Sequence, residues 1–193
     1  MNEQKSSFWG VKTFADKQIV DNRGITFPFL DYNSKWPEIN GGGFKVKRIL
    51  ISSNREYVIR GIHLAPFAMN QWKLVSCIKG TIKDYVIDFR PLSTSFGVTD
   101  NYLLSAQLSN SILIPPGIGH AFQALEEDSM VIYAINNEYV KSEEKAINPL
   151  DPEIKIDWHR DFIISERDAS APLLKETSSK TIDGFRLNWD TNT

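Results

Sequence analysis

The chain has 193 residues, of which 41% are hydrophobic and 24% charged, and its formal net charge is −2. This balance argues against nucleic acid or an anionic membrane as the main partner, and no run approaches the roughly 20 apolar residues of a membrane span. A single cysteine, Cys77, excludes an intrachain disulfide and a cysteine-based zinc site. The polar N-terminal residues lack a signal-peptide pattern, so we expect a cytoplasmic protein.

Short runs rich in β-branched and aromatic residues dominate between about residues 44 and 140. Gly, Pro, Asn and Ser separate these runs at intervals of roughly 10 residues, which is typical of a β-sandwich or a closed barrel. No helical periodicity long enough to build βαβ units lies between them. The predicted strands are, in chain order, 44–52, 57–60, 73–78, 81–89, 103–104, 111–114 and 129–135.

The segments that flank the predicted strands give weaker structural signals. Residues 31–37 favour a short helix or turn, and residues 142–145 favour a helical turn that ends at the following Asn-Pro. The polar segment after residue 176 predicts a tail. We expect one domain over 1–193, with its core at about 12–175 and a C-terminal tail at 176–193.

Histidine and lysine side chains interrupt the apolar strand pattern. His63 ends the run that contains Arg60, and Lys73 follows ten residues later. An imidazole and an ammonium from neighbouring strands can remove a proton beside a carbonyl and hold the resulting enolate. Two alternatives stay open: His63 as a core histidine, and Lys73 on an outer face with Trp72 and Leu74 facing inward.

Several carboxyl and hydroxyl groups could complete such a site. Asp84 and Asp88 share one strand face, where one or both could orient a histidine or simply end a ladder. His120 follows a stiff Pro-Pro-Gly-Ile-Gly turn, which suits a residue at a rim. Tyr133 and Tyr139 share a face if the strand is unbroken, either as buried hydroxyls or as proton donors.

A metal site is the competing interpretation. Two histidines and a carboxylate can bind iron or zinc, but the sequence has no His-x-His motif. The third histidine, His159, stands in what reads as a surface turn. We therefore expect no metal.

Taken together, these residues resemble the motifs of the dTDP-4-dehydrorhamnose 3,5-epimerase family, a branch of the cupin fold. The resemblance covers roughly residues 15–175 in the family's order. The matching motifs are Arg60-Gly61-Ile62-His63, Gln71-Trp72-Lys73, Gly80 to Arg90, Ser95-Phe96-Gly97, Pro115-Pro116-Gly117 with His120, Tyr133 with Tyr139, 147–152, 156–158 and 165–169.

The resemblance implies an all-β jelly roll with short peripheral helices that works as a homodimer without metal or cofactor. Its substrate would be a nucleotide-linked 4-keto-6-deoxyhexose, with dTDP as the expected nucleotide, inverted at C3 or at C3 and C5 in deoxysugar and surface-polysaccharide biosynthesis. By the same resemblance, His63 is the base, Asp168 orients it, Lys73 stabilises the C4 enolate and Tyr133 reprotonates from the opposite face.

The resemblance also implies a substrate-binding set. Two arginines would bind diphosphate, a tyrosine would lie along the sugar or base, and a histidine–aspartate pair would line the pocket. The two arginines would be Arg23 and Arg60, the tyrosine would be Tyr139, and the pair would be His120 with Asp84. Arg48 and Phe27 belong to the same predicted set.

Four positions depart from the family pattern. Thr26 and Pro28 stand where the family has an aromatic residue and a glutamate, and Arg48 and Leu50 stand where it has Gln and Asn. Such positions contact the nucleotide or the sugar in the family, some of them across the dimer. The proton-transfer set is thus intact and the recognition set is altered. A catalytically idle sugar-nucleotide-binding cupin and a metal-dependent cupin isomerase are the alternatives.

Overall fold

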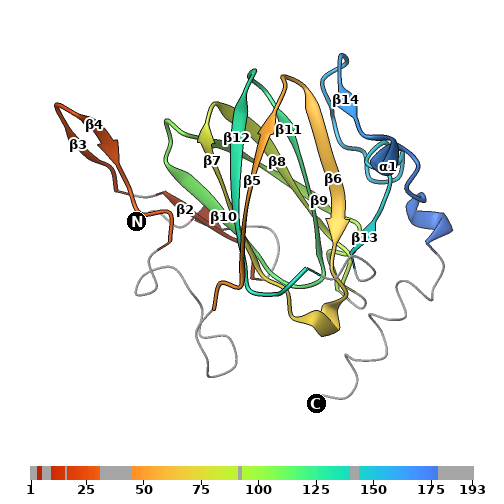
Figure 1. Cartoon of the computed structure of the whole chain (residues 1–193). Helices are drawn as coiled ribbons and strands as arrows, with labels where there is room; N and C mark the ends of the chain where they lie inside the picture. The colour runs from red at the N-terminus through yellow and green to blue at the C-terminus, as the bar shows by residue number, and fades with distance from the viewer. Residues whose placement is uncertain are drawn as a thin grey trace.

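Two facing antiparallel sheets form the body of the computed structural model, which describes residues 4–5, 10–15, 17–30, 45–90, 93–139 and 144–177 (Figure 1). The main strands of one sheet lie in the order β5-β12-β7-β10, and those of the other in the order β6-β11-β8-β9. The chain therefore crosses between sheets after each strand except at the β8–β9 connection, which is the pattern of a jelly roll. This confirms the predicted fold class. The bounds are β5 (Arg48–Asn54), β6 (Val58–Leu64), β7 (Lys73–Lys79), β8 (Thr81–Asp88), β9 (Thr99–Ser105), β10 (Asn110–Ile114), β11 (Ile118–Ala124) and β12 (Ser129–Ile135).

One central strand escaped the sequence analysis. β11 lies between β6 and β8, and all seven of its residues are buried. Burial on both faces removes the polar–apolar alternation that marks a half-buried strand, and the preceding Pro-Pro-Gly reads as a turn. His120 is consequently the third residue of a buried strand and not a rim residue, which corrects the expectation from sequence.

The N-terminal segment adds strands that the sequence did not predict. β1 (Gln4–Lys5) and β2 (Lys12–Ala15) extend the first sheet beside β10. β3 (Ile19–Asp21) and β4 (Gly24–Thr26) pair only with each other and project away from the jelly roll (Figure 1). This hairpin leaves Ile19, Val20 and Ile25 between 53% and 67% exposed.

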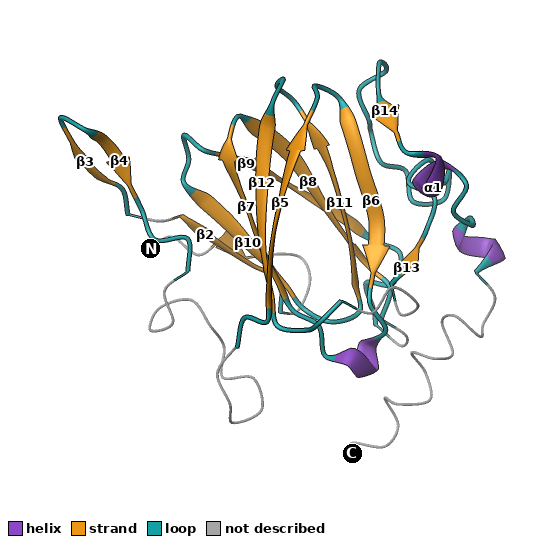
Figure 2. Cartoon of the chain, in the orientation of Figure 1, coloured by secondary structure: helices purple, strands orange, loops and turns teal. Residues whose placement is uncertain are grey.

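The C-terminal segment returns to the outer edge of β6. β13 (Lys145–Ala146) pairs with the end of β6 in antiparallel fashion, and β14 (Ile163–Ile164) pairs with its beginning in parallel. The helices η1 (Phe67–Met69), α1 (Glu166–Ala169) and η2 (Leu174–Glu176) are short and peripheral, as expected (Figure 2). No helix in the described segments is long and apolar enough to cross a membrane.

Three local expectations fall wholly or partly outside the described residues. The predicted helix or turn at 31–37 and most of the predicted tail lie outside them. Of the predicted helical turn at 142–145, only the last two residues are described, and Lys145 belongs to β13.

Apolar side chains form one cluster between the sheets and one on the outer face of each sheet. The inner cluster includes Val75, Val86 and Phe122. The C-terminal segment covers the outer face of the second sheet with Ile147 and Ile154. Each such side chain contributes roughly 1.5–3 kcal/mol on burial. Toward β5 and β6 the inner cluster gives way to polar side chains, and the cavity described below lies there.

A buried carboxylate holds the turn after β8. Asp88 accepts hydrogen bonds from the backbone N–H and guanidinium of Arg90 at 2.7–2.9 Å and from the hydroxyls of Ser93 and Ser95 at 2.6 Å. Burial alone would raise the pKa of Asp88, but these donors lower it to about 2. Of the two aspartates on β8, Asp88 is thus a structural anchor.

Replacing Asp88 by Asn should lower the free energy of unfolding by about 3–5 kcal/mol, because it removes one charge of a buried, hydrogen-bonded ion pair. Urea unfolding at pH 7 measures this loss. As a control, Asp128→Asn breaks the exposed 3.5 Å pair with Lys79 and should cost about 1 kcal/mol or less. Equal losses in the two variants would contradict the structural role of Asp88.

The stabilisation that Asp88 provides depends on pH. The pKa of Asp88 in the folded chain, about 2, is below its ordinary 3.8, so its stabilisation is complete above about pH 4 and is lost as the pH falls through 2. The difference in free energy of unfolding between the wild type and Asp88→Asn should therefore become smaller as the pH falls from 4 to 2.

Candidate active site

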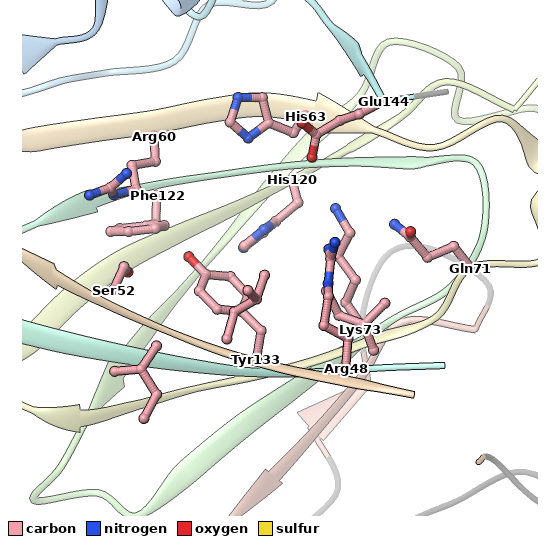
Figure 3. Close-up of a pocket in the computed structure, with 13 residues that line it drawn as sticks. Arg48, Ser52, Arg60, His63, Gln71, Lys73, His120, Phe122, Tyr133 and Glu144 are labelled. Carbon is pink, nitrogen blue, oxygen red and sulfur yellow. The ribbon is translucent and has the colours of Figure 1, made fainter. Parts of the chain in front are cut away.

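A cavity of about 230 Å³ opens between the two sheets at the side bounded by β5 and β6 (Figure 3). Both sheets and the segment before β13 contribute side chains to it. The lining residues are Arg48, Leu50, Ile51, Ser52, Arg60, His63, Gln71, Lys73, His120, Phe122, Tyr133, Ile135 and Glu144. Six residues singled out from the sequence are among them, so the fold brings most of the predicted site together.

A bulge in β6 gives the cavity two of its polar side chains. The strand pairing runs from His120 opposite His63 to Phe122 opposite Arg60, so β6 has one residue more than β11 over this stretch. In a regular strand, residues three apart point to opposite faces, whereas the extra residue returns both Arg60 and His63 to the cavity side.

The bulge depends on a glycine. Gly61 has a φ of 118°, and a Cβ there would lie 2.5 Å from the carbonyl oxygen of His120. Only glycine adopts this backbone at such a close approach without strain.

His63 and Asp168 form the first of two histidine–aspartate pairs. Nε2 of His63 lies 2.8 Å from Oδ1 of Asp168, and the N–H of Gly61 donates to Oδ2 at 3.3 Å. Ser165 caps α1 by accepting from the N–H of Asp168. A carboxylate partner keeps the proton on Nε2 and leaves Nδ1 as the acceptor.

The two members of this pair differ in exposure. The side chain of His63 is 25% exposed, and that of Asp168 is 6% exposed. Burial alone would raise the pKa of Asp168, but the hydrogen bond and charge of His63 and the N–H of Gly61 lower it. Asp168 is therefore ionised near neutral pH, and the imidazole it orients can accept a proton from a bound molecule.

His120 and Asp84 form the second pair, deeper in the cavity. Nε2 of His120 lies 2.7 Å from Oδ2 of Asp84, and both side chains are buried. Burial raises the pKa of Asp84, and the charges of His120 and Lys73 offset part of that increase. Of the alternatives left open by the sequence, Asp84 therefore orients a histidine.

Lys73 faces the cavity from β7. Its side chain lines the cavity, while Leu74 points to the outer cluster, so the inward alternative holds for Lys73. Burial lowers the pKa of Lys73 to about 8; the charges of Glu144 and Asp84 raise it and that of Arg48 lowers it. Near neutral pH, Lys73 is a largely protonated ammonium that faces the cavity.

Tyr133 lies on β12 across the cavity from β6. Its ring meets that of His120 edge-on, with 6.2 Å between the centroids. Burial strongly raises the pKa of the Tyr133 hydroxyl, and Ser52 offsets part of the increase. The Tyr133 hydroxyl is therefore protonated near neutral pH and can donate its proton to a strong base. β12 ends at Ile135, so Tyr139 lies beyond the strand and does not continue its face.

Two arginines border the cavity. Nε of Arg60 donates to Oδ1 of Asn54 at 2.7 Å, and the amide of Asn54 donates to the carbonyl of Ser129. The guanidinium of Arg48 lies 4.8 Å from the ring centroid of Tyr139, while the buried Nε of Arg48 has no hydrogen-bond partner among the described residues. Arg48 and Tyr139 also line a small recess of about 10 Å³ that shares Gln71 and Glu144 with the cavity.

Of the predicted substrate-binding residues, Asp84 is bound to the cavity residue His120 and Tyr139 lines the recess, whereas Arg23 and Phe27 line neither. Arg23 sits at the turn of the β3–β4 hairpin, where it pairs with Asp21 at 2.6 Å and is 84% exposed. Phe27 directly follows the same hairpin. Neither is among the cavity residues.

Four polar or aromatic lining residues were missed from the sequence: Ser52, Gln71, Phe122 and Glu144. Gln71 and Phe122 adjoin residues that were singled out, which is a usable signal. Glu144 stands in a charged run that reads as a solvated surface. Its carboxylate nonetheless accepts from Nη2 of Arg167 at 2.7 Å and is only 24% exposed.

The arrangement combines an oriented histidine on one wall, a protonated tyrosine on the other and an ammonium that lines the same cavity (Figure 3). A carbon acid beside a carbonyl could lose a proton to one face and regain one on the other. The ammonium would stabilise the intermediate oxyanion.

Comparisons with known proteins agree with this chemistry. Residues 5–176 match the family described as dTDP-4-dehydrorhamnose 3,5-epimerase. A dTDP-4-dehydrorhamnose 3,5-epimerase of Mycolicibacterium smegmatis is 35% identical over 181 residues, which cover 93% of this chain and 89% of that protein. A dTDP-4-dehydrorhamnose 3-epimerase of Streptomyces niveus is 31% identical, covering 86% and 81%.

A solved structure shares the fold as well. The dTDP-6-deoxy-D-glucose-3,5-epimerase RmlC of Legionella pneumophila, in complex with dTDP-4-keto-L-rhamnose, has a TM-score of 0.85 and 27% identity, covering 93% of this chain and 95% of that chain. The match over nearly the whole chain, with the paired histidines, lysine and tyrosine around one cavity, shows that the chain belongs to the dTDP-4-dehydrorhamnose 3,5-epimerase family.

Proposed function

We propose that the protein is an epimerase of a dTDP-linked 4-keto-6-deoxyhexose, acting at C3 or at both C3 and C5. The observation that carries this function is the placement of His63 on β6 and Tyr133 on β12 at opposite walls of one cavity that Lys73 also lines (Figure 3). The names of the Mycolicibacterium and Streptomyces relatives and the sugar nucleotide bound to the Legionella enzyme support the substrate class. A single domain with its core at about 12–175 would carry the activity.

The reaction follows from the carbonyl at C4. Nδ1 of His63 takes the proton from C3, and the C–H electron pair forms a C3–C4 double bond while the C4 oxygen becomes an enolate. The ammonium of Lys73 stabilises that oxygen. Tyr133 then donates its proton to the other face of C3 as the carbonyl reforms, which inverts the centre. Solvent returns both groups to their starting protonation states.

The remaining cavity residues suit a sugar nucleotide. Arg60, held by Asn54 at 2.7 Å, presents its terminal guanidinium nitrogens for the diphosphate. Tyr139 at the recess offers a face for the sugar or the base. The buried pair of His120 and Asp84 adds polar groups to the cavity floor.

We further propose a homodimer in which the β3–β4 hairpin of each protomer reaches the cavity of its partner. Arg23 and Phe27 would then meet the nucleotide in trans. Ile19, Val20 and Ile25 of the hairpin are more than half exposed, as are Ile49 and Ile51 on β5. Exposed apolar side chains in such numbers support a protein–protein interface.

Deuterium exchange tests the reaction directly. A dTDP-linked 4-keto-6-deoxyglucose incubated with enzyme in deuterium oxide should take up deuterium at C3, and also at C5 if both centres are inverted, as followed by ¹H NMR. His63→Ala should slow this exchange about 10²-fold or more, because it deletes the general base. Asp168→Asn should retain the fold and slow exchange less.

Three outcomes would contradict the proposal. Tight sugar-nucleotide binding with no exchange in the wild type would indicate an idle binding protein. Near-normal exchange in His63→Ala would put the base elsewhere, with His120 the first candidate. Exchange that is lost with a chelator and restored by a transition metal would favour a metal-dependent isomerase.

Tyr133→Phe separates proton removal from inversion. The base remains, so deuterium should still enter the substrate, but the epimerised product should fall by about 10²-fold because the opposite face lacks its donor. Product and isotope content can be read from the same NMR spectra. Unchanged product formation would mean that solvent supplies the proton and that Tyr133 only packs.

The trans arrangement predicts complementation between two impaired variants. Arg23→Ala should weaken turnover, and His63→Ala should abolish it. After subunit exchange at equal concentrations, half of the dimers are mixed and each has one complete site, so activity should recover to about a quarter of the wild-type value. If Arg23 serves the cavity of its own chain, the mixture will show no recovery. Size-exclusion chromatography with light scattering verifies the dimer.

A further inference from the structure

Two charged residues approach Lys73 from different sides of the cavity. Arg48 begins β5, and Ile135 of β12 is paired with Arg48 on one side and with Lys73 of β7 on the other. The three residues therefore form one cross-strand row, with the two cations two strand spacings apart, about 10 Å between backbones. Both long side chains line the cavity (Figure 3).

Glu144 supplies the opposite charge. It directly precedes β13 and lines both the cavity with Lys73 and the recess with Arg48. Arg167 of α1 fixes its carboxylate through a 2.7 Å ion pair. Burial alone would raise the pKa of Glu144, but this hydrogen bond and the charges of His63, Arg167 and Lys73 lower it. The carboxylate is therefore ionised near neutral pH.

We infer that Glu144 and Arg48 are positioning residues that set the protonation of Lys73 in opposite directions. Glu144 favours the ammonium, and Arg48 favours its loss. Neither has to touch the reacting atoms for this role. For turnover, the role rests on the proposed enolate chemistry, in which Lys73 must be charged to hold the oxyanion.

The other charged and titratable groups around Lys73 are already engaged. Asp84 on β8 is bound to His120 on β11, and His63 on β6 is bound to Asp168. The other two groups are Arg60 on β6, bound to Asn54, and Tyr133 on β12, which keeps its proton. After burial, the charge of Glu144 has the largest effect on the pKa of Lys73, and it raises that pKa. The charge of Arg48 lowers the same pKa in addition to the effect of burial.

The direction of each effect follows from the sign of the charge. Lys73 has a pKa of about 8, set mainly by burial. Removing the negative charge of Glu144 must lower that pKa further, and removing the positive charge of Arg48 must raise it. A neighbouring charge moves a pKa by about 1–3 units when it is within about 4–6 Å, and less at longer range.

Titration of Lys73 in the ligand-free protein tests this directly. In protein labelled with ¹⁵N-lysine, the Lys73 Nζ resonance is assigned from its absence in Lys73→Met and followed from pH 6 to pH 11. Glu144→Gln should lower the pKa, and Arg48→Gln should raise it, each by about half a pH unit or more. The double variant should return close to the wild type.

Two controls separate charge from structure. Arg167→Met removes the ion pair but keeps the Glu144 charge, so it should not lower the pKa of Lys73. Glu153→Gln removes an exposed carboxylate far from the cavity lining and should leave the titration unchanged. Shifts in the same direction for Glu144→Gln and Arg48→Gln, no shift in either, or a decrease in Arg167→Met would each overturn the inference.

Activity gives an independent readout. If Lys73 must be protonated, the alkaline limb of the deuterium-exchange rate should move to lower pH in Glu144→Gln and to higher pH in Arg48→Gln. Because the titration requires no substrate, opposite shifts of the Lys73 resonance without a matching change in the rate profile would overturn the assigned role of Lys73 in turnover and leave the electrostatic inference standing.

Discussion

The extra residue in β6 is the constraint on which the site depends. It turns Arg60 and His63, which a regular strand would send to opposite faces, toward one cavity. Gly61 makes this possible because its backbone approaches β11 too closely for a side chain. Its freed N–H then binds Asp168, which also holds His63. This one bulge thus determines the direction of the His63 side chain, the position of Asp168 and the position of Arg60.

The two histidine–aspartate pairs differ in their surroundings, and this difference suits them to different roles. His63 is partly exposed at the cavity and has one ring nitrogen left for a ligand, whereas His120 and Asp84 are enclosed. Enclosure disfavours a change of charge, so the deep pair fixes the cavity floor while the outer pair can cycle its proton.

Most strands and the central residues of the site could be predicted, because alternation and turn residues mark half-buried strands and because His63 and Lys73 interrupt them. β11 escaped because burial on both faces erases alternation. The bulge at Gly61 leaves no periodic signal. Glu144 lies among charged residues that resemble solvent-facing ones, and the partnership of Asp168 with His63 spans 105 residues. That pairing followed from family resemblance, since contacts made by tertiary folding leave no local pattern.

The docking of β13 and β14 against β6 also connects the orientation of His63 to a segment outside the eight jelly-roll strands. The eight jelly-roll strands end at Ile135, but the carboxylate that orients the imidazole arrives only when the following segment returns to the far edge of β6. Detaching this segment from β6 removes the carboxylate partner of His63 without removing any of the eight strands. The orientation of the imidazole therefore depends on whether the segment after Ile135 is docked.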